Sequence, residues 1–458
     1  MYMKMALKYY FDYAAATPLE PRVFKAMKPY FAERFGNPGS IHDAGRKAKE
    51  AIEKASAKIA SILHCRPKEF IFTGSATEAD NLAIFGVAKA NPIRGLEDSS
   101  SSLVSQPASN GASKKTGNKI IISALEHKAV LAPCNALAEE GFDIVKLKVD
   151  KTGLINPADI AKFLNSKTIL VSIIYADNET GTIQPIREIA RVIKKFRAKN
   201  NSALPYFHTD ASQAAQYCDI NVEKLGVDLM TVSSHKLYGP KGIGGLYIRK
   251  GVKIKPLIFG GGQQNNMRSG TENVPSIIGF AEALALAEKN KNKECVRVKK
   301  LKSELEQGIF KLIPKVVLNG HSQKRLPNFL NVSILDIEGE AALLYLDQKG
   351  ISASTGSACD SQTLEPSHVI LALGRPYEYA HGRLRFTLGK YTTQKSVRYL
   401  LKYLPPIVKR LRQMSPVEIK IDEEKEISLP RAFIGGQTPH FLRKHGKQKD
   451  SNHSFSHS

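Results

Sequence analysis

The stretch Ser233-Ser-His-Lys-Leu-Tyr-Gly-Pro-Lys-Gly-Ile-Gly-Gly-Leu-Tyr-Ile248 is the part of the sequence that best indicates the fold. An apolar, β-branched segment precedes it, and its last residues form a second apolar run, so two β-strands are predicted. Lys236 then lies on a short turn between them. A lysine in such a turn is suited to desolvation and to use as a nucleophile or imine-forming amine. The plain alternative is a surface hairpin whose lysine has no role.

Length and composition set the class of protein. The 458 residues suffice for one large domain and a smaller one, and the contents of hydrophobic (42%) and charged (24%) residues are typical of soluble globular proteins. No apolar run approaches the length of a membrane span, and no apolar signal core precedes Asp12. We therefore expect no export and a cytoplasmic location by default. The five cysteines include no Cys-x-x-Cys pair, which argues against a disulfide framework or a cysteine-rich zinc site.

The net charge of +24 raises the question of a polyanionic partner. The lysines are spread along the chain and enriched in the C-terminal tail, and neither a zinc-finger pattern nor an aromatic RNA-binding motif is present. Direct binding of nucleic acid is therefore not expected as the main function. An acidic protein partner explains the charge equally well.

Strand and helix patterns alternate between residues 44 and 210. We predict helices at 44–63, 156–164 and 186–199, and strands at 69–73, 119–123, 142–147, 168–174 and 206–210. Such alternation is typical of a mostly parallel sheet covered by helices, whose ligand lies outside the carboxyl ends of the strands. Six side chains that could bind a ligand or take part in catalysis fall at or just after predicted strand ends: Thr77, His127, Asn178, Asp210, Gln213 and Lys236.

The rest of the chain indicates a second, smaller domain. We predict a large sheet domain over 10–285, joined by a long helix to a smaller α/β C-terminal domain over 286–414, with part of the N-terminal lead packing on the latter. The serine-rich segment within 91–118 is low in complexity and is interpreted as a disordered insertion. The polar, basic tail at 415–458 is also expected to be partly disordered.

The residues at the strand ends match the needs of pyridoxal phosphate. Lys236 could bind the cofactor covalently, Asp210 could keep its pyridinium nitrogen protonated, and His127 could stack on its ring. The turn from Gly74 to Thr77, together with Ser233 and His235, could hold the phosphate with hydroxyls and free backbone N–H groups. Each residue alone has a plainer explanation, such as a turn former or a helix cap. Their joint placement favours the cofactor.

Cys359 marks a second reactive centre. It lies in a loop of small polar residues, where a thiol can move and react, whereas Cys65, Cys134, Cys218 and Cys295 are interpreted as structural. Arg385, on a later predicted strand, could bind a substrate carboxylate through two hydrogen bonds, and Asn37 could assist. A surface salt bridge is the plain alternative for Arg385.

Six motifs together carry a family resemblance. They are Gly74-Ser-Ala-Thr-Glu-Ala-Asp-Asn81, Glu126-His-Lys-Ala-Val130, His208-Thr-Asp-Ala-Ser-Gln213, Ser233-Ser-His-Lys-Leu-Tyr-Gly-Pro-Lys-Gly242, Arg268-Ser-Gly-Thr-Glu-Asn273 and Ser354-Thr-Gly-Ser-Ala-Cys359. In this order they resemble the cysteine desulfurases of the NifS/IscS kind, class V members of the aminotransferase-like (fold type I) superfamily that depends on pyridoxal phosphate. The resemblance extends from about Tyr10 to Met414; the serine-rich insertion and the extended tail depart from the family pattern.

The resemblance implies a role for each matching residue. Lys236 corresponds to the lysine that anchors the cofactor, His127 to the residue that stacks on its ring, and Cys359 to the nucleophile that becomes a persulfide. The other implied cofactor contacts are Ala76, Thr77, Asn178, Asp210, Gln213, Ser233, His235 and, from the other subunit of a homodimer, Thr271. Asn37 and Arg385 match the substrate-carboxylate clamp.

The implied reaction converts L-cysteine to L-alanine and passes the sulfur through Cys359 to acceptor proteins. The length of the Cys359 loop matches the group that serves scaffold proteins in iron–sulfur cluster assembly or tRNA thiolation. No resident metal is expected, although the persulfide on Cys359 could contact an iron–sulfur cluster. Two alternatives stay open: a selenocysteine lyase or another class V enzyme, and a basic binding protein that retains an inactive fold of this type.

Overall fold

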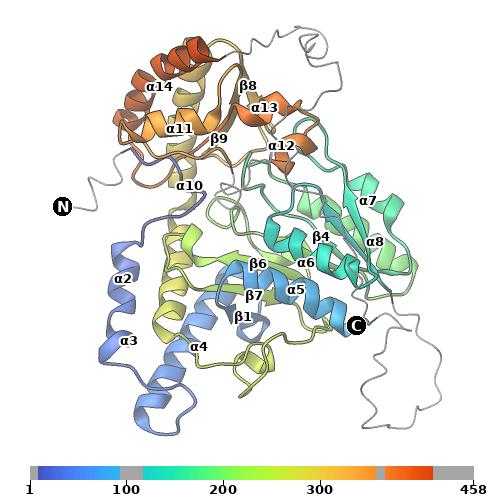
Figure 1. Cartoon of the computed structure of the whole chain (residues 1–458). Coiled ribbons are helices and arrows are strands. Elements are labelled where there is room, and N and C mark those ends of the chain that lie inside the picture. Colours follow the sequence, from blue (N-terminus) through green and yellow to red (C-terminus); the bar gives the residue numbers. More distant parts are fainter. Residues whose placement is uncertain (1–8, 93–116, 357–366, 416–458) are drawn as a thin grey trace, which may run out of the picture. The chain divides into compact units, whose positions relative to one another are not determined.

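The computed structural model describes residues 9–92, 117–356 and 367–415, which belong to one compact unit (Figure 1). Cys359, the basic tail from residue 416 and nearly all of the predicted insertion at 91–118 lie outside the described residues. Within the described part, no helix combines the length and the apolar character that crossing a membrane requires.

A seven-stranded sheet forms the centre of the large part of the chain. Its strand order is β1-β7-β6-β5-β4-β2-β3, and all neighbours from β6 to β3 are parallel, whereas β7 is antiparallel to both β6 and β1. The prediction of a mostly parallel sheet is thus confirmed. The strands are β1 (Phe70–Thr73), β2 (Lys119–Ser123), β3 (Asp143–Leu147), β4 (Thr168–Ser172), β5 (Tyr206–Asp210), β6 (Leu229–Ser233) and β7 (Gly244–Ile248).

Helices cover both faces of this sheet because its strands carry apolar residues on both sides. In β2, Ile121 packs into the core under α4 (Asp43–Leu63), α8 (Ile186–Lys199) and the first part of α10 (Val274–Leu312). Its neighbours Ile120 and Ile122 point the other way, as alternation along a strand requires, toward α5 (Ala76–Ala90) and α6 (Lys128–Glu139).

The C-terminal part contains a second, antiparallel sheet of order β10-β9-β8. Its strands are β8 (Val316–Asn319), β9 (Phe329–Ile334) and β10 (Arg383–Thr387), and its core includes side chains of α11 (Gly339–Asp347) and α14 (Gln394–Met414). Phe11 from the N-terminal segment joins this core, beside bridges from Tyr10 to Ser352 and from Asp12 to Thr387. The predicted boundary at residue 285 falls inside the continuous helix α10 and stays a prediction.

The hairpin around Lys236 has the predicted form. β6 pairs with β7 from Leu229 opposite Ile248 to Ser233 opposite Gly244, and the 3₁₀ turn Ser234–Lys236 follows β6 directly. A Cβ atom on Gly244 would lie 2.6 Å from the backbone nitrogen of Ala76. Glycine is therefore required at this position, because it lets β7 run against the first residues of α5. Close packing brings the start of α5 next to the turn that carries Lys236.

Candidate active site

One cavity of about 270 Å³ collects most of the predicted site residues. It lies at the carboxyl ends of β4, β5 and β6, where polar side chains follow the buried strands. Ten of the predicted residues line it: Ala76, Thr77, His127, Asn178, Asp210, Gln213, Ser233, His235, Lys236 and Arg385. Residues from six separate segments of the sequence therefore converge on a single space.

The N-terminal segment holds Lys236 at one wall of the cavity. The Lys236 ammonium donates to the backbone carbonyl oxygens of Ala14 and Ala15, the latter at 2.9 Å, and the amide of Gln213 also donates to Ala14, at 3.0 Å. The hydroxyl of Thr17 donates to the carbonyl of His235 at 2.7 Å. The two bonds to Ala14 and Ala15 thus hold the lysine in a partly buried position rather than extended into solvent as on a surface hairpin.

Buried carboxyl groups surround the base of the cavity. Asp210, at the end of β5, accepts a hydrogen bond from the backbone N–H of Ser212 at 2.8 Å. Burial, together with the charge of Asp210, raises the pKa of Asp80 well above its usual range, and burial raises the pKa of Glu126 to about 8. Burial therefore favours the protonated, uncharged forms of Asp80 and Glu126.

The histidines of the site are neutral for the same physical reason. Burial lowers the pKa of His127, and burial together with the charge of Lys236 lowers the pKa of His235 to about 4. His127 caps α6, because its Nδ1 accepts the backbone N–H of Ala129 at 3.1 Å. The capping bond fixes the orientation of an uncharged aromatic ring at the cavity wall, which suits stacking on a flat ligand.

The start of α5 provides an anion-binding surface. Ser75 caps this 15-residue helix by accepting the backbone N–H of Glu78 at 3.1 Å, and the first helical residues, Ala76 and Thr77, line the cavity. Helix N-termini offer free N–H groups and a favourable dipole to anions. On the neighbouring turn, the hydroxyl of Ser233 lies 3.0 Å from Nδ1 of His235. The surface suits a phosphate group.

Arg385 is a buried cation, not a surface one. Only 2% of the residue is exposed; one terminal nitrogen donates to the carbonyl of Asn178 at 2.7 Å and the other to Oδ1 of Asp12 at 2.8 Å. Its Nε has no partner among the described residues. A cation fixed on two sides at the cavity wall is well suited to a carboxylate ligand.

Three predicted residues are not placed at this cavity. Asn37 is exposed, and its side chain accepts a hydrogen bond from the backbone of Gly39. Thr271 is also exposed, in the loop that precedes α10, and a role from a second subunit is not tested by one chain. Cys359 lies outside the described residues, although Gly356, just before that segment, lines the cavity. The roles of all three stay predictions.

The other four cysteines have the character of structural residues. Burial raises the pKa of Cys65, Cys134 and Cys218 to about 12, and it also raises the pKa of Cys295. Such thiols carry almost no thiolate at neutral pH and are poor nucleophiles.

Sequence reasoning missed several residues that shape the cavity. Asp80 lines it and Asp12 holds Arg385, yet neither was singled out. Both carboxylate oxygens of Asp80 are buried without a hydrogen-bond partner among the described residues. The available signal was a carboxyl group inside the motif Gly74–Asn81, whereas the pairing of Asp12 with Arg385 joins residues 373 positions apart and has no local signal.

Known proteins share both the sequence and the fold. The aminotransferase class-V family model matches residues 9–95 and 97–400. A cysteine desulfurase IscS of Dictyoglomus turgidum is 47% identical over 90% of this chain and 97% of its own length. A cysteine desulfurase IscS of Methanosarcina thermophila is 45% identical over 90% of this chain and 94% of its own length. A solved NifS-like protein has a TM-score of 0.78 and 36% identity, covering 88% of this chain and all of its own. The chain therefore belongs to the aminotransferase class-V family of pyridoxal-phosphate enzymes.

Proposed function

We propose that the chain is a cysteine desulfurase that uses pyridoxal phosphate and a thiol of its own. The overall change converts L-cysteine and the Cys359 thiol into L-alanine and a Cys359 persulfide. One carbon–sulfur bond is broken and one sulfur–sulfur bond is formed, so no external oxidant or reductant is needed. The observation that carries this proposal is the convergence of Lys236, Asp210, His127 and Arg385 on one cavity whose wall includes Gly356.

The cavity fits the cofactor in charge and shape. Lys236 would hold it covalently, Asp210 would face its ring nitrogen, and the neutral ring of His127 would stack on it. The α5 N-terminus, with Ser233 and His235, would bind its phosphate. When bound, pyridoxal phosphate supplies an electron sink that makes the substrate Cα–H acidic.

The protein's own residues orient the substrate and move its proton. Arg385 would hold the substrate carboxylate so that the Cα–H points toward Lys236. The assisting contact from Asn37, which does not line this cavity, stays a prediction from the resemblance. When Lys236 is not bonded to the cofactor, its amine would accept the substrate Cα proton. The contacts from Ala14 and Ala15 keep that amine at the cavity wall.

Cys359 would remove the sulfur. Gly356, which lines the cavity, precedes Cys359 by three positions in the sequence. The Cys359 thiolate attacks the substrate sulfur, and the electron pair of the broken carbon–sulfur bond stays on the carbon skeleton that becomes alanine. The raised pKa values of Cys65, Cys134 and Cys218 support Cys359 as the reactive thiol.

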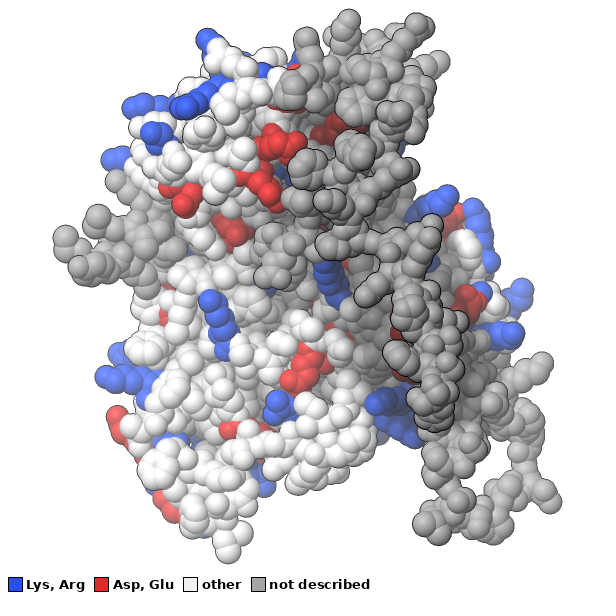
Figure 2. Space-filling model, in the orientation of Figure 1, with Lys and Arg blue, Asp and Glu red and all other residues white. Residues whose placement is uncertain are grey.

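The partners follow from this chemistry. A persulfide must pass its sulfur on, and we infer acceptor proteins for iron–sulfur cluster or tRNA sulfur biosynthesis, a homodimer in which Thr271 reaches the partner's cofactor, and a cytoplasmic location. On the described part of the face in Figure 2, Lys and Arg side chains are scattered among Asp, Glu and uncharged residues.

The decisive assay measures alanine and sulfide formed from L-cysteine with pyridoxal phosphate and a reducing thiol. The wild type should form both in equal amounts, and Cys359→Ser should lose sulfide release while it keeps the visible absorbance of the bound cofactor. Normal sulfide release by Cys359→Ser would refute the proposal. Parallel assays with L-selenocysteine distinguish a selenocysteine lyase from a cysteine desulfurase, because the activity of the lyase would not depend on Cys359.

A further inference from the structure

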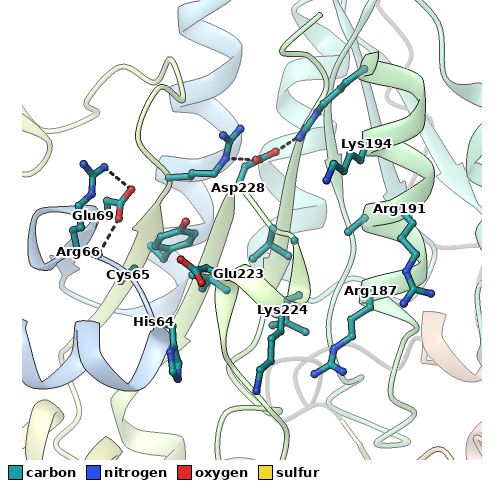
Figure 3. Close-up of a pocket in the computed structure, with 18 residues that line it drawn as sticks. His64, Cys65, Arg66, Glu69, Arg187, Arg191, Lys194, Glu223, Lys224 and Asp228 are labelled. Carbon is teal, nitrogen blue, oxygen red and sulfur yellow. Dashed lines mark hydrogen bonds and ion pairs between the residues drawn. The ribbon is translucent and has the colours of Figure 1, made fainter. Parts of the chain in front are cut away.

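A second concave site, the basic cleft, lies away from the catalytic cavity and has a volume of about 860 Å³ (Figure 3). One side is the connection between α4 and β1, and the other is α8; the floor is formed by residues 222–228. Seven cationic and three anionic side chains line it: Arg66, Arg187, Arg191, Lys194, Arg197, Lys224 and Arg249, with Glu69, Glu223 and Asp228.

The basic cleft and the catalytic cavity lie at opposite ends of the same strands. Glu69 precedes β1 and borders the cleft, whereas Ala76 follows β1 and lines the cavity. In the same way, Asp228 precedes β6 and Ser233 ends it. A five-residue strand spans about 17 Å, so a ligand in the cleft does not touch the catalytic residues.

Part of the positive charge in the cleft is balanced internally. Arg66 pairs with Glu69 at 2.8 Å, and Arg187 pairs with Asp219 at 2.7 Å. Asp228 pairs with two arginines. Its Oδ1 accepts a hydrogen bond from Arg249 at 2.6 Å, and its Oδ2 accepts one from Arg197. The same Oδ2 also accepts the backbone N–H of Phe207. One carboxylate between two guanidinium groups leaves a net positive charge at this end of the cleft.

Three further cations are weakly paired or unpaired with carboxylates. Within the described parts of the chain, Lys194 and Lys224 form no ion pair within 4.0 Å, and Arg191 is 3.9 Å from Glu188, at the limit of an ion pair. Figure 3 shows Arg187, Arg191 and Lys194 along α8, and Lys224 beside them from the floor. Like charges gathered in one concave site repel each other, and a bound anion relieves that repulsion.

The form of the cleft favours a small ligand with several charges. Its volume lies in the range of small-molecule sites, and the cations stand on both sides of a concave space rather than along a flat face. Arginine matches phosphate geometry with two parallel hydrogen bonds, while lysine adds a mobile point charge.

We propose that the basic cleft is a binding site for a small polyphosphate anion, either a nucleoside triphosphate or a free phosphate chain. Arg191, Lys194 and Lys224 provide the charges that the ligand neutralises. The ion-paired arginines Arg197 and Arg249 are held in place by Asp228 and border the same site. This site is separate from the proposed desulfurase chemistry and does not depend on it.

Calorimetry on the full-length protein tests the proposal. Pyridoxal phosphate is first fixed by borohydride reduction, so that the phosphate site of the catalytic cavity is filled. Tripolyphosphate and ATP are titrated at low salt, with adenosine as the uncharged control. We expect saturable one-to-one binding of both anions and none of adenosine. Tighter binding of ATP than of tripolyphosphate identifies a nucleotide, and equal binding identifies the phosphate chain alone.

Two charge-matched variants locate the site. Arg191→Glu with Lys194→Glu should weaken tripolyphosphate binding by at least about tenfold, since charged hydrogen bonds are lost and repulsion is added. The control variant, Lys195→Glu with Lys199→Glu, changes the net charge by the same amount at exposed positions of the same helix that do not line the cleft. Its affinity for tripolyphosphate should stay within about twofold of the wild-type value.

Three results would overturn the proposal. The first is an absence of saturable binding, and the second is an equal loss of affinity in the two double variants, which would mean non-specific attraction. The third is tighter binding of an acidic polyglutamate peptide than of either phosphate ligand, which would assign the cleft to an acidic protein.

Discussion

The catalytic cavity and the basic cleft lie at the two ends of β6 and differ in how their ionisable side chains are charged. At the carboxyl end, burial favours the uncharged forms of several ionisable neighbours: it raises the pKa of Asp80 and lowers the pKa of His127 and His235. At the amino end, the arginines and lysines of the basic cleft are largely exposed or ion-paired and keep their charge. The first arrangement suits chemistry at a few defined atoms, and the second suits salt-sensitive binding.

The largest expected effect in the catalytic cavity is the loss of Lys236. Lys236→Ala removes both the covalent anchor and the proton acceptor, so alanine formation should fall by at least about 10³-fold. Lys241→Ala alters an exposed lysine of the same hairpin and should leave the rate unchanged. Alanine formation and the visible absorbance of the lysine-bound cofactor measure the two roles. A Lys236→Ala variant with a tenth of the normal rate would contradict the assignment.

Replacement of Arg385 should give the next largest effect. Arg385→Lys keeps the charge but loses the fixed fork that bonds Asn178 and Asp12, so kcat/KM for L-cysteine should fall about 10- to 100-fold, mainly through KM. The inhibition constant of L-alanine should rise in parallel, because the product has the same carboxylate. If both constants stay unchanged, Arg385 is a structural residue only.

Burial of Glu126 predicts a pH-dependent stability. The carboxyl keeps its proton up to about pH 8 in the folded state but loses it near its usual pKa of 4.5 when unfolded. The unfolded state therefore binds fewer protons between these values, and the free energy of unfolding should fall as pH rises from about 4.5 to 8, by an amount on the order of a few kcal/mol.

Glu126→Gln should remove that part of the slope. Glutamine retains an oxygen that can accept the hydroxyl of Ser123 and the backbone N–H of Ile174. Denaturant unfolding at a series of pH values measures the difference between the two proteins. Parallel pH profiles for wild type and Glu126→Gln would show that Glu126 does not titrate in this range.

The smallest effect is expected from the basic cleft. Arg191→Glu with Lys194→Glu should change kcat/KM for L-cysteine by less than about twofold, because the length of a strand, about 17 Å, exceeds the screening length at physiological salt. Steady-state kinetics at two salt concentrations checks this independence. A tenfold change at physiological salt would mean that the two ends of the strands are coupled.

The hydrophobic pattern predicted the central sheet and the turn of Lys236 because buried parallel strands and their polar ends are local signals. The strand β8 and the helices α12 (His368–Ala372) and α13 (Tyr377–His381) were not predicted, since they are short. The proton states of Asp80 and Glu126 depend on burial by distant segments. The bond from Arg385 to Asp12 also joins distant segments of the chain. Only the tertiary structure therefore reveals these proton states and this bond.

The most direct test of the central claim follows a single turnover without an acceptor. The cofactor-loaded protein is mixed with L-cysteine, alanine is quantified, and the cysteine-containing peptides are analysed by mass spectrometry. We expect one alanine per active site and one added sulfur atom on the peptide of Cys359, with none on those of Cys65, Cys134, Cys218 or Cys295. Alanine formed without a persulfide on Cys359, or with the sulfur on another cysteine, would contradict that claim.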